Sequence, residues 1–565
     1  MDSRYPDINS KKGCQIENTG SGLFRLSRSG QYTGLLEFIF FLFLIITPLY
    51  LTISDYGITS DEPIYQEAAG QIKRWLHLEY NEQFHSEMIN RYWKTDPLRN
   101  VHPSGTKIFY LLAQTSILWE KDPYIQNTVF NIFLFGLSFS IFLIWYFKGS
   151  PFKSITCILL LLSIPRFFAH AHFHATDIPM TSMLLLFIVA TDKWIGTKFF
   201  WLPGIILGFF LSIKITSVLL AAPAFLILLI FNKGNIKKVI LKLIIVLLFG
   251  CLTFYILNPD YWYHPLIRLR EFLHQSTTRK EWTPITVFFG GIFYKYRAPW
   301  HYPFVMFIIT TPIFHSILLA IGTISLFFKK KLQRQKTAIV LSVFVTPFII
   351  LSLPMFPAHD GIRYLLPAFP FIVCLMTAGL IKLVYFIRRY NEYSSTLKIL
   401  SFGVIFFLIL IAAADFHNPA RVPPFELSYY NSIAGGLPGA RRHGFEITYW
   451  WEILNDTVIE EINNLCGNSY VYFPLPPVDL YFKNMVDSKK FRFKPSYDIN
   501  RADFMLIIGR PYVEYWERRT IPLLKKQNRF FSSLWGISLD SVPIIKLYII
   551  KDHKQAKLKT NDPNF

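Results

Sequence analysis

Three acidic side chains lie where hydrophobic stretches of the sequence give way to polar residues. Asp61 and Glu62 are adjacent and follow the first long hydrophobic segment, and Asp177 follows a segment rich in histidine. Ionisable residues at the edge of a membrane usually have a function, and a carboxylate there can orient or deprotonate a hydroxyl group. As an alternative, Ser60 or Asp61 caps the amphipathic helix predicted over residues 64–76 and Glu62 lies in its first turn, a role that does not exclude catalysis.

Four basic side chains are placed to bind an anion such as phosphate. Lys214 interrupts the otherwise apolar segment 202–230, where a charge is costly unless it reaches an interface or meets an anion. Arg363 lies at the mouth of a hydrophobic segment and can bind phosphate through two N–H groups. Arg268 belongs to a loop rich in aromatic and basic residues, and Lys107 lies one turn into a short helix. Snorkelling to the membrane surface is the alternative for Lys214, and interfacial anchoring is the alternative for Lys107.

Histidine and tyrosine residues near these charges add further candidates. His102 stands at the start of the short helix, and His174 is the last of three alternating histidines before Asp177. Alternating imidazoles can bind zinc, but polar side chains at a membrane interface are the commoner explanation, and no Cys-x-x-Cys pair occurs. We therefore assign no metal ligand and no certain cofactor, and a divalent metal stays an alternative. Tyr364, next to Arg363, is the remaining candidate site residue.

These residues are separated by hydrophobic segments of membrane-spanning length. The chain has 565 residues, of which 52% are hydrophobic and 17% aromatic. A membrane-crossing helix needs about 20 mostly apolar residues. Nearly uncharged runs cover residues 33–53, 126–147, 241–257, 304–328, 338–353 and 400–414. The net charge of +21 comes mainly from basic residues between such runs, as the positive-inside rule expects, so we do not predict a nucleic-acid partner.

The basic clusters also predict which loops share a side of the membrane. If the short apolar stretch 104–119 dips into the outer leaflet without crossing, every strong basic cluster becomes cytoplasmic. The sequence then predicts a polytopic α-helical membrane protein with about eleven transmembrane helices and an extracytoplasmic C-terminus. Asp61, Asp177 and the loops 258–301 and 357–367 would share the extracytoplasmic face, although none of them entered the topology argument.

The same pattern divides the chain into domains. Residues 1–32 are predicted to be a cytoplasmic tail and residues 33–415 the membrane domain, in which residues 54–124 form the first extracytoplasmic loop with juxtamembrane helices. The apolar content falls near Asp415, so residues 416–565 are predicted to be a small extracytoplasmic α/β domain. Its expected helices cover residues 447–465 and 511–526, and its expected strands cover residues 469–473, 504–508 and 544–550.

In order and spacing, these motifs resemble those of GT-C glycosyltransferases of the protein O-mannosyltransferase and aminoarabinose transferase kind. The similarity is to the bacterial form with an extracytoplasmic C-terminal domain and covers about residues 33–455. The matching features are Asp61-Glu62, His102-Pro103, Asp177-Ile178-Pro179-Met180, Gly208 with Lys214-Ile215-Thr216, Arg363-Tyr364-Leu365-Leu366-Pro367, and the run from Tyr429-Tyr430-Asn431 to Tyr449-Trp450. The resemblance implies that Asp61 is the catalytic carboxylate and Asp177 a second acidic site residue. It also implies that Lys214 and Arg363 contact the donor phosphate.

The function implied by the resemblance is an inverting transfer of a hexosyl or pentosyl group at the extracytoplasmic face. The donor would be a polyprenyl-phosphate sugar, and the acceptor a lipid, a glycan or a protein. Cations would stabilise the phosphate leaving group as its charge develops. The alternatives are a transporter or flippase, a ligase or polymerase for lipid-linked sugars, and a non-catalytic scaffold. Transporters usually contain inverted repeats and helices broken at the membrane midplane, and the sequence indicates neither.

Overall fold

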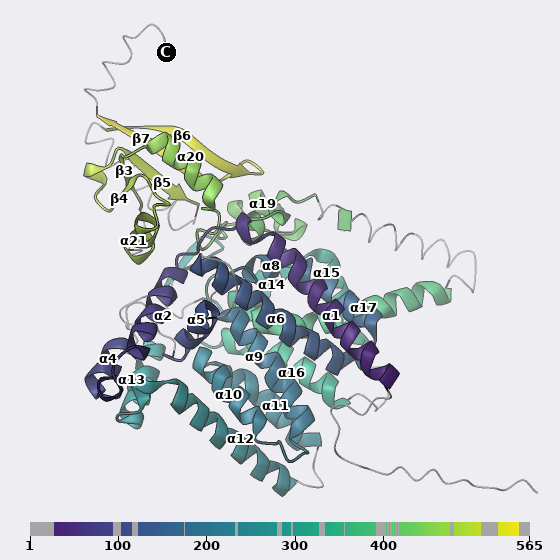
Figure 1. Ribbon diagram of the computed structural model, residues 1–565. Helices are drawn as coiled ribbons and strands as arrows, with labels where there is room; N and C mark the ends of the chain where they lie inside the picture. Colours follow the sequence, from purple (N-terminus) through teal and green to yellow (C-terminus); the bar gives the residue numbers. More distant parts are fainter. Residues whose placement is uncertain are drawn as a thin grey trace, which may run out of the picture.

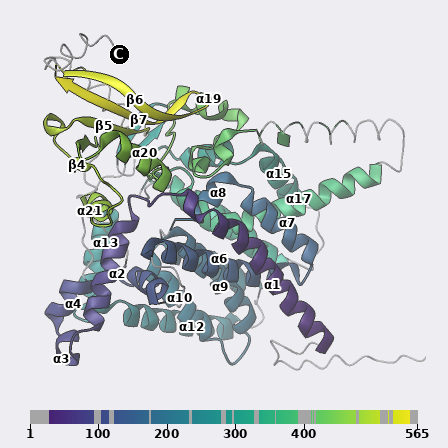
Figure 2. The ribbon, with the colours of Figure 1, turned by 45° about the horizontal axis from the view of Figure 1, so that its top comes forward.

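A computed structural model of the protein describes most of the chain. The described residues are 28–93, 103–115, 122–173, 176–231, 236–278, 285–294, 298–326, 334–354, 356, 358–390, 403, 406, 410, 412, 413, 415, 417–474, 479–509, 522 and 529–552. The helices form one bundle, and a smaller unit that contains a β-sheet lies at one end of it (Figure 1). A second view shows the same placement, with the sheet beyond the ends of the bundle helices (Figure 2).

Five helices in the described part of the chain are long and apolar enough to cross a membrane. They are α1 (Arg28–Leu51), α6 (Pro123–Phe147), α12 (Ile236–Leu257), α16 (Arg334–Ser352), and α17 (Phe369–Tyr390) together with the short 3-10 helix η5 (Arg363–Ala368). Three shorter apolar helices accompany them, namely α7 (Pro151–Leu162), α10 (Leu202–Ile213) and α11 (Ser217–Phe231). The chain is therefore mostly helical with several membrane-length helices, as expected. The number of about eleven spans stays a prediction.

A sixth membrane-length segment is broken in the middle. Helices α14 (Tyr302–Thr310) and α15 (Ile313–Leu326) meet at an angle of 117°. Pro312 lies in the break and has no N–H to continue the helix. The side-chain amide of Asn431 donates to the carbonyls of Ile308 and Thr311, both at 2.7 Å, and so satisfies backbone groups that the break leaves open. The expectation that no helix is broken was therefore wrong. The Asn431 side chain, which is distant in the sequence, stabilises the break by bonding two of its carbonyls.

Shorter elements fill the segments between these helices. They are α2 (Glu62–Leu76), α3 (Tyr80–Gln83), α4 (Ser86–Trp93), α5 (Thr106–Thr115), α8 (Pro165–His170), α9 (Asp177–Trp194), η3 (Pro259–Tyr261), α13 (Pro265–Thr278), β1 (Ile285–Phe288) and β2 (Gly291–Tyr294). Helix α2 buries Ala68, Ile72 and Trp75 at helical spacing, which confirms the predicted amphipathic helix. The ten residues of α5 rise by only about 15 Å, half of the roughly 30 Å hydrocarbon core.

The C-terminal unit combines helices with a five-stranded sheet. It contains α19 (Gly436–Arg442), α20 (Asp456–Cys466), β3 (Tyr470–Tyr472), α21 (Asp479–Asp487), β4 (Lys494–Ser496), β5 (Phe504–Ile508), β6 (Arg529–Leu539) and β7 (Val542–Asp552). The strand order is β4-β3-β5-β7-β6. Strand β3 pairs parallel to both of its neighbours, and β7 pairs antiparallel to both of its neighbours.

Most of the predicted α/β pattern agrees with this unit, with one correction. The three expected strands correspond to β3, β5 and β7, whereas β4 and β6 were not predicted. The helix expected over residues 447–465 begins only at Asp456, where the Asn455 side chain caps it by accepting from the Val458 N–H. The residues before it are not helical because their backbone is bonded to the segment before α2, as described below. The helix expected over residues 511–526 lies almost entirely outside the described residues.

Candidate active site

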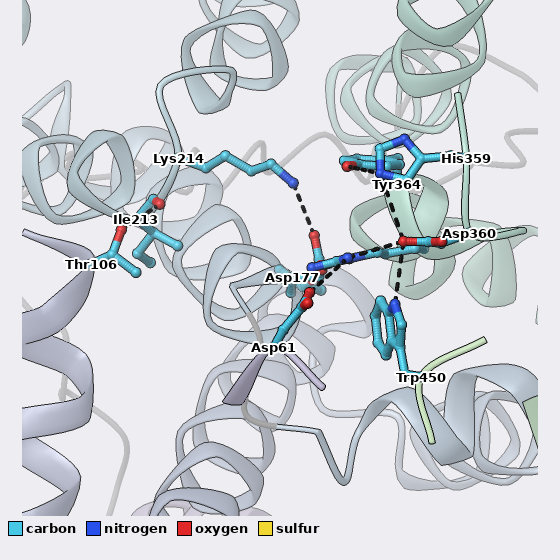
Figure 3. Close-up of polar contacts among 11 residues, drawn as sticks. Asp61, Thr106, Asp177, Ile213, Lys214, His359, Asp360, Tyr364 and Trp450 are labelled. Atoms are coloured by element: carbon cyan, nitrogen blue, oxygen red, sulfur yellow. Dashed lines mark hydrogen bonds and ion pairs between the residues drawn. The ribbon is translucent and has the colours of Figure 1, made fainter. Parts of the chain in front are cut away.

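Arg363 is the centre of a buried cluster of ion pairs, and it begins the short helix η5. Its Nε donates to Asp177 Oδ2 at 2.7 Å. Its Nη1 donates to Asp360 Oδ2 at 3.2 Å and to Asp61 Oδ2 at 3.4 Å. One guanidinium therefore joins carboxylates from three segments that lie more than one hundred residues apart in the sequence. The candidates Asp61, Asp177 and Arg363 come together as the sequence analysis expected, and Figure 3 shows Asp61 beside Asp177.

Lys214 completes the cluster from the other side of Asp177. It lies at the break between α10 and α11, and its Nζ donates to Asp177 Oδ1 at 3.2 Å (Figure 3). The same ammonium lies 4.3 Å from the centre of the Tyr364 ring, a cation–π distance. The buried lysine therefore meets an anion within the protein, in agreement with the preference for anion contact over snorkelling.

Asp177 holds the two cations and is the first residue of α9. Burial alone would raise the pKa of Asp177, but Lys214 and Arg363 outweigh it and hold this pKa well below its usual range. The N-terminal end of a helix also favours a negative charge. A carboxylate with such a low pKa is a poor proton acceptor, and Asp177 contacts both Lys214 and Arg363. Of the acidic candidates, Asp61 is then better placed to act as a base.

Asp61 and Glu62 differ in what their carboxylates contact. Glu62 is buried, and its Oε2 accepts from the N–H of Thr59 at 2.7 Å and from the Thr59 hydroxyl at 2.9 Å. Glu62 thus closes the turn of residues 59–62 that leads into α2. Asp61 occupies the cap position of α2 but makes no capping hydrogen bond with its side chain. Its side chain is 38% exposed and contacts Arg363, so the carboxylate is directed to the cluster.

Three residues of the cluster were not predicted as site residues, namely His359, Asp360 and Trp450. The Trp450 indole N–H donates to Asp360 Oδ2 at 3.3 Å, and its ring stacks on the Arg363 guanidinium at 4.2 Å. Asp360 and Gly361 both adopt positive φ angles, 55° and 64°, so a tight turn points the Asp360 carboxylate back at Arg363. Asp360 could have been found from its place three residues before Arg363. No local signal in the sequence identifies Trp450.

The backbone around Trp450 is bonded to the segment that leads into α2. The N–H of Ser60 donates to the Trp450 carbonyl at 3.0 Å, and the N–H of Gly57 donates to the Glu452 carbonyl at 2.7 Å. Glu452 is fully buried and accepts from the N–H of Trp450 at 3.0 Å. Main-chain hydrogen bonds therefore fix the position of Trp450, a residue of the C-terminal unit, relative to Asp61.

Arg166 supports the Asp360–Gly361 turn from behind. It is fully buried, donates through Nε to the Tyr429 carbonyl at 3.1 Å, and stacks on the Tyr430 ring at 4.5 Å. A Cβ atom at Gly361 would lie 2.7 Å from Arg166 Nη1, so only glycine fits this approach. The motif that contains Tyr429 and Tyr430 thus contributes to the site indirectly, by holding the turn that carries Asp360.

The candidate Tyr364 lies beside the cluster and borders it with an aromatic ring. Besides its contact with Lys214, its hydroxyl makes a hydrogen bond of 3.1 Å with His359 Nε2. His359 Nε2 in turn lies 3.7 Å from Asp360 Oδ2. The side chains of His359, Asp360 and Tyr364 therefore form one edge of the cluster, which the Tyr364 ring connects to Lys214 (Figure 3).

Two predicted phosphate contacts, Lys107 and Arg268, lie elsewhere. The Lys107 ammonium is buried and donates to the Trp93 carbonyl at 3.0 Å, and burial lowers the pKa of Lys107 to about 8. Arg268 donates to Asn90 Oδ1 at 2.8 Å. Within the described residues, neither cation contacts a carboxylate of the Arg363 cluster. Lys107 belongs to α5 and Arg268 to α13, and each of them bonds a residue of α4.

The predicted anion site at the start of α5 is taken by a carboxylate of the chain itself. The Ser104 hydroxyl donates to Asp260 Oδ1, and Asp260 is the side chain whose charge acts most on Lys107. Burial raises the pKa of Asp260 to about 6. The positive charge of Lys107, which was predicted to face a ligand, therefore has the acidic side chain of Asp260 as its neighbour within the chain.

The remaining histidine candidates give no support for a metal. His102 and His174 lie outside the described residues. His172 is buried, burial lowers its pKa to about 4, and its Nδ1 and Nε2 lie 2.8 and 2.9 Å from the Phe168 and Leu49 carbonyl oxygens. The neutral ring has one N–H and donates to one of them at a time. His170 packs edge-on against Trp450 with a centroid distance of 5.1 Å. In the part of the chain that the structure covers, no group of three or more potential ligands is arranged for a metal ion.

Comparison with known proteins gives one kind of match. No protein-family model matches this chain, and no curated protein matches it. The chain is similar to two crystal structures of ArnT from Cupriavidus metallidurans, one in the apo state and one bound to undecaprenyl phosphate. Each comparison covers 92% of this chain and 98% of the other, with identities of 12% and 11% and TM-scores of 0.44 and 0.43 respectively. At so low a similarity the likeness supports no conclusion about the site, and the proposal below rests on the geometry described above.

Proposed function

We propose that this chain is a membrane glycosyltransferase that takes a sugar from a lipid-phosphate donor. The observation that carries the proposal is the arrangement of Asp61, Asp177 and Arg363 with Lys214. Two cations share one buried carboxylate, and a second, partly exposed carboxylate lies at the edge of the same cluster. Cations that can meet a phosphate and a carboxylate that can take a proton are the two requirements of such a transfer.

In the proposed reaction an acceptor hydroxyl attacks the anomeric carbon of the donor sugar. The hydroxyl proton passes to Asp61, and a bond forms between the acceptor oxygen and the anomeric carbon. The bond from this carbon to the phosphate oxygen breaks, and its electron pair stays on the phosphate, which Lys214 and Arg363 stabilise. A single displacement of this kind inverts the configuration at the anomeric carbon.

The charges of the cluster suggest how the donor enters. Three carboxylates, those of Asp61, Asp177 and Asp360, face two cations. A phosphate therefore has to replace one carboxylate at Arg363. Asp61 is the best candidate to leave, because its contact with Arg363 is the longest of the three at 3.4 Å and its side chain is 38% exposed. Donor binding would then release Asp61 to receive the acceptor.

The finer features of the proposal come from the sequence pattern. We place the site and the C-terminal unit, residues 416–565, at the extracytoplasmic face, and we keep about eleven spans in the membrane domain, residues 33–415. The donor is proposed to be a polyprenyl-phosphate sugar, and the acceptor a lipid, a glycan or a protein. The broken helix α14–α15 is a feature that transporters also use. Here the amide of Asn431 occupies carbonyls at the break, which does not favour a substrate site there.

One experiment tests the proposal directly. The protein is purified in a mild detergent, and the lipids that co-purify with it are identified by mass spectrometry. The donor found in this way is then incubated with the protein in lipid nanodiscs, and release of the lipid phosphate is followed. We expect a lipid-phosphate sugar to co-purify and the lipid phosphate to be released only when an acceptor is present. A lipid-linked sugar that binds but is never cleaved by any acceptor fraction would instead support the transporter alternative.

A further inference from the structure

A buried polar junction lies immediately before Lys214 in the chain. It is formed by the start of α5, the end of α10 and the residue after α12, through Thr106, Ser212 and Asn258. We infer that Thr106 and Asn258 are positioning residues, which set the direction in which Lys214 leaves α10 toward Asp177. The kinetic consequence of this inference rests on the proposed function, whereas its structural part does not.

Thr106 satisfies the open end of α10. The last carbonyls of a helix have no partner within the helix, and α10 ends at Ile213 because Lys214 is extended, with φ −158° and ψ 122°. The Thr106 hydroxyl is shared between the carbonyl of Ile213 at 2.8 Å and that of Ser212 at 3.0 Å. Ile213 comes directly before Lys214, whose ammonium bonds Asp177 (Figure 3).

Asn258 ties three segments together and is itself fully buried. Its Oδ1 accepts from the N–H of Gly105 at 2.6 Å and lies 3.2 Å from the Ser104 hydroxyl, whose single hydrogen it shares with Asp260 Oδ1. Its Nδ2 donates to Ser212 Oγ at 3.0 Å and to the Phe254 carbonyl at 2.7 Å. Both amide hydrogens and both lone pairs of the oxygen are thus used. A side chain bonded in four directions fixes the relative positions of α5, α10 and α12.

Close backbone packing leaves this junction little freedom to shift. A Cβ atom on Gly105 would lie 2.8 Å from the Ser212 Cβ and 2.9 Å from the Asn258 amide atoms. A Cβ atom on Gly208, one turn before Ser212, would lie 2.3 Å from the Thr253 Cβ. Real side chains do not approach this closely, so both contacts require glycine. The end of α10 is therefore held from two sides.

Such a junction matters because a lysine is intrinsically a poorly directed cation. Its ammonium ends a flexible four-carbon stem, unlike the planar fork of arginine. Lys214 Nζ nevertheless lies 3.2 Å from Asp177 Oδ1 and 4.3 Å from the centre of the Tyr364 ring. Holding its backbone rigid is what keeps the ammonium at these two contacts. A catalytic group displaced by about 1 Å can lose roughly a hundredfold in rate.

The test compares two substitutions at one position. Thr106→Val keeps the shape of the side chain and removes the hydroxyl, and Thr106→Ser keeps the hydroxyl. Thr156→Val is the matched control, because the Thr156 hydroxyl also bonds a helix carbonyl, that of Phe152 at 2.8 Å, but on the exposed side of α7. Ser212→Ala is a second variant, which removes one bond of Asn258 and the bond from the Ser212 hydroxyl to the Gly208 carbonyl.

Two readouts are measured on each full-length variant in nanodiscs. The first is the rate at which acetic anhydride acetylates Lys214 across a pH series, followed by peptide mass spectrometry. The second is kcat/KM for the donor in the transfer assay. We expect Thr106→Val to raise the acetylation rate of Lys214 and to lower kcat/KM about tenfold. Thr106→Ser and Thr156→Val should behave like the wild type, and Ser212→Ala should lie between.

The outcomes separate this inference from the proposed function. Unchanged acetylation of Lys214 in both Thr106→Val and Ser212→Ala would overturn the inference, whatever the activities are. Faster acetylation in Thr106→Val, reversed in Thr106→Ser, supports it. If acetylation responds in this way but Lys214→Ala transfers sugar as well as the wild type, the positioning role stands and the proposed function of Lys214 fails.

Discussion

Asp61 and Glu62 are neighbours in the sequence, yet their carboxylates lie in opposite surroundings. Glu62 turns back onto Thr59 and is buried, whereas Asp61 faces Arg363 with 38% of its side chain exposed. Successive residues of a helix point about 100° apart, so one carboxylate at the start of α2 can close the turn that precedes the helix while the other is directed to the cluster. The two carboxylates therefore form a natural pair of test and control.

Asp61→Asn should abolish most of the transfer activity while the fold is kept. The amide preserves the shape of the side chain but removes its basicity, and a general base contributes about 10²–10⁴ in rate. The loss should appear in kcat. The donor KM should stay the same or fall, because a neutral side chain competes less with phosphate for Arg363. Donor turnover by the purified variant in nanodiscs measures both constants.

Glu62→Gln is the control for that change, and it should keep most of the activity. Its carboxylate contacts Thr59, so the expected effect is a small loss of thermal stability from a weakened turn in front of α2. Near wild-type transfer by Asp61→Asn together with a large loss in Glu62→Gln would show that the wrong carboxylate has been chosen. Full activity in both variants would contradict the proposal that this chain is a glycosyltransferase.

Lys214→Ala and Arg363→Ala should each weaken use of the donor. A hydrogen bond to a charged group contributes about 1.5–3 kcal/mol, so kcat/KM for the donor should fall by one to two orders of magnitude, as about 1.4 kcal/mol corresponds to tenfold. Arg268→Ala removes a cation that bonds Asn90 instead of the cluster, and it should leave kcat/KM near the wild-type value. Equal effects at all three positions would point to a general loss of charge instead of a donor contact.

Trp450 should contribute through both its ring and its N–H. Trp450→Phe keeps an aromatic face over Arg363 and removes the hydrogen bond to Asp360, whereas Trp450→Leu removes both contacts. We expect a stepwise fall in kcat/KM, smaller for Phe than for Leu, since a desolvated cation–π contact is worth up to about 2 kcal/mol. If the two variants are equally active, the ring does not support Arg363 in the working enzyme.

Site residues could be predicted where the neighbouring sequence marks them, and not where their role depends on contacts with residues far away in the chain. Lys214 and Arg363 stand out because each charge interrupts or borders an apolar segment, and such charges are expensive unless they have a partner. Asp61 and Asp177 stand out for the same reason. Trp450 carries no such signal, because aromatic residues are common at membrane interfaces. Its role follows from main-chain hydrogen bonds to residues about 390 positions away, such as that from Ser60, which no local pattern encodes.

The predictions that were wrong also have physical reasons. Lys107 was predicted to meet a ligand because it follows a helix start. The carboxylate at this helix start is that of Asp260, a residue of η3 that is distant in the sequence. The break between α14 and α15 was missed because Pro312 alone does not decide between a kink and a break. The outcome depends on Asn431, which supplies hydrogen bonds to the opened carbonyls. Helix lengths were predicted well where apolar runs are continuous, as for α6 and α12.

Glu426 should make the stability of the protein fall as pH rises. Burial raises the pKa of Glu426 to about 8, although the Tyr56 hydroxyl donates to its carboxylate at 2.7 Å. In the unfolded chain a glutamate titrates near 4.5. Between about pH 4.5 and pH 8 the folded state thus binds a proton that the unfolded state has lost, so this contribution decreases as pH increases.

Glu426→Gln cannot titrate, and its melting temperature should therefore change less than that of the wild type between about pH 5 and pH 8. Melting curves of the detergent-solubilised proteins at several pH values give the comparison. Glu67→Gln is the control, because Glu67 is a half-exposed partner of Arg74, and it should keep the pH dependence of the wild type. Parallel curves for the wild type and Glu426→Gln would exclude a buried, protonated Glu426.

The side of the membrane on which the cluster lies can be measured through the C-terminal unit. Arg363 bonds both Asp61 and Asp177, so these residues share one side whatever the number of spans. Ser60 is bonded to Trp450, which connects the cluster to the chain that leads into α20 and α21. A label on α21 therefore reports the side of the cluster. Lys483 is an exposed residue of α21, and Lys331 belongs to the basic block predicted to be cytoplasmic.

Single cysteines at these two positions, Lys483→Cys and Lys331→Cys, would be introduced after the five native cysteines have been replaced. A membrane-impermeant maleimide applied to intact cells should label Lys483→Cys at once and Lys331→Cys only after permeabilisation, because basic clusters are retained on the cytoplasmic side. Labelling of both from outside would contradict the arrangement with about eleven spans. Labelling of Lys483→Cys only after permeabilisation would place Asp61 and Arg363 in the cytoplasm, where an extracytoplasmic lipid-linked donor cannot reach them.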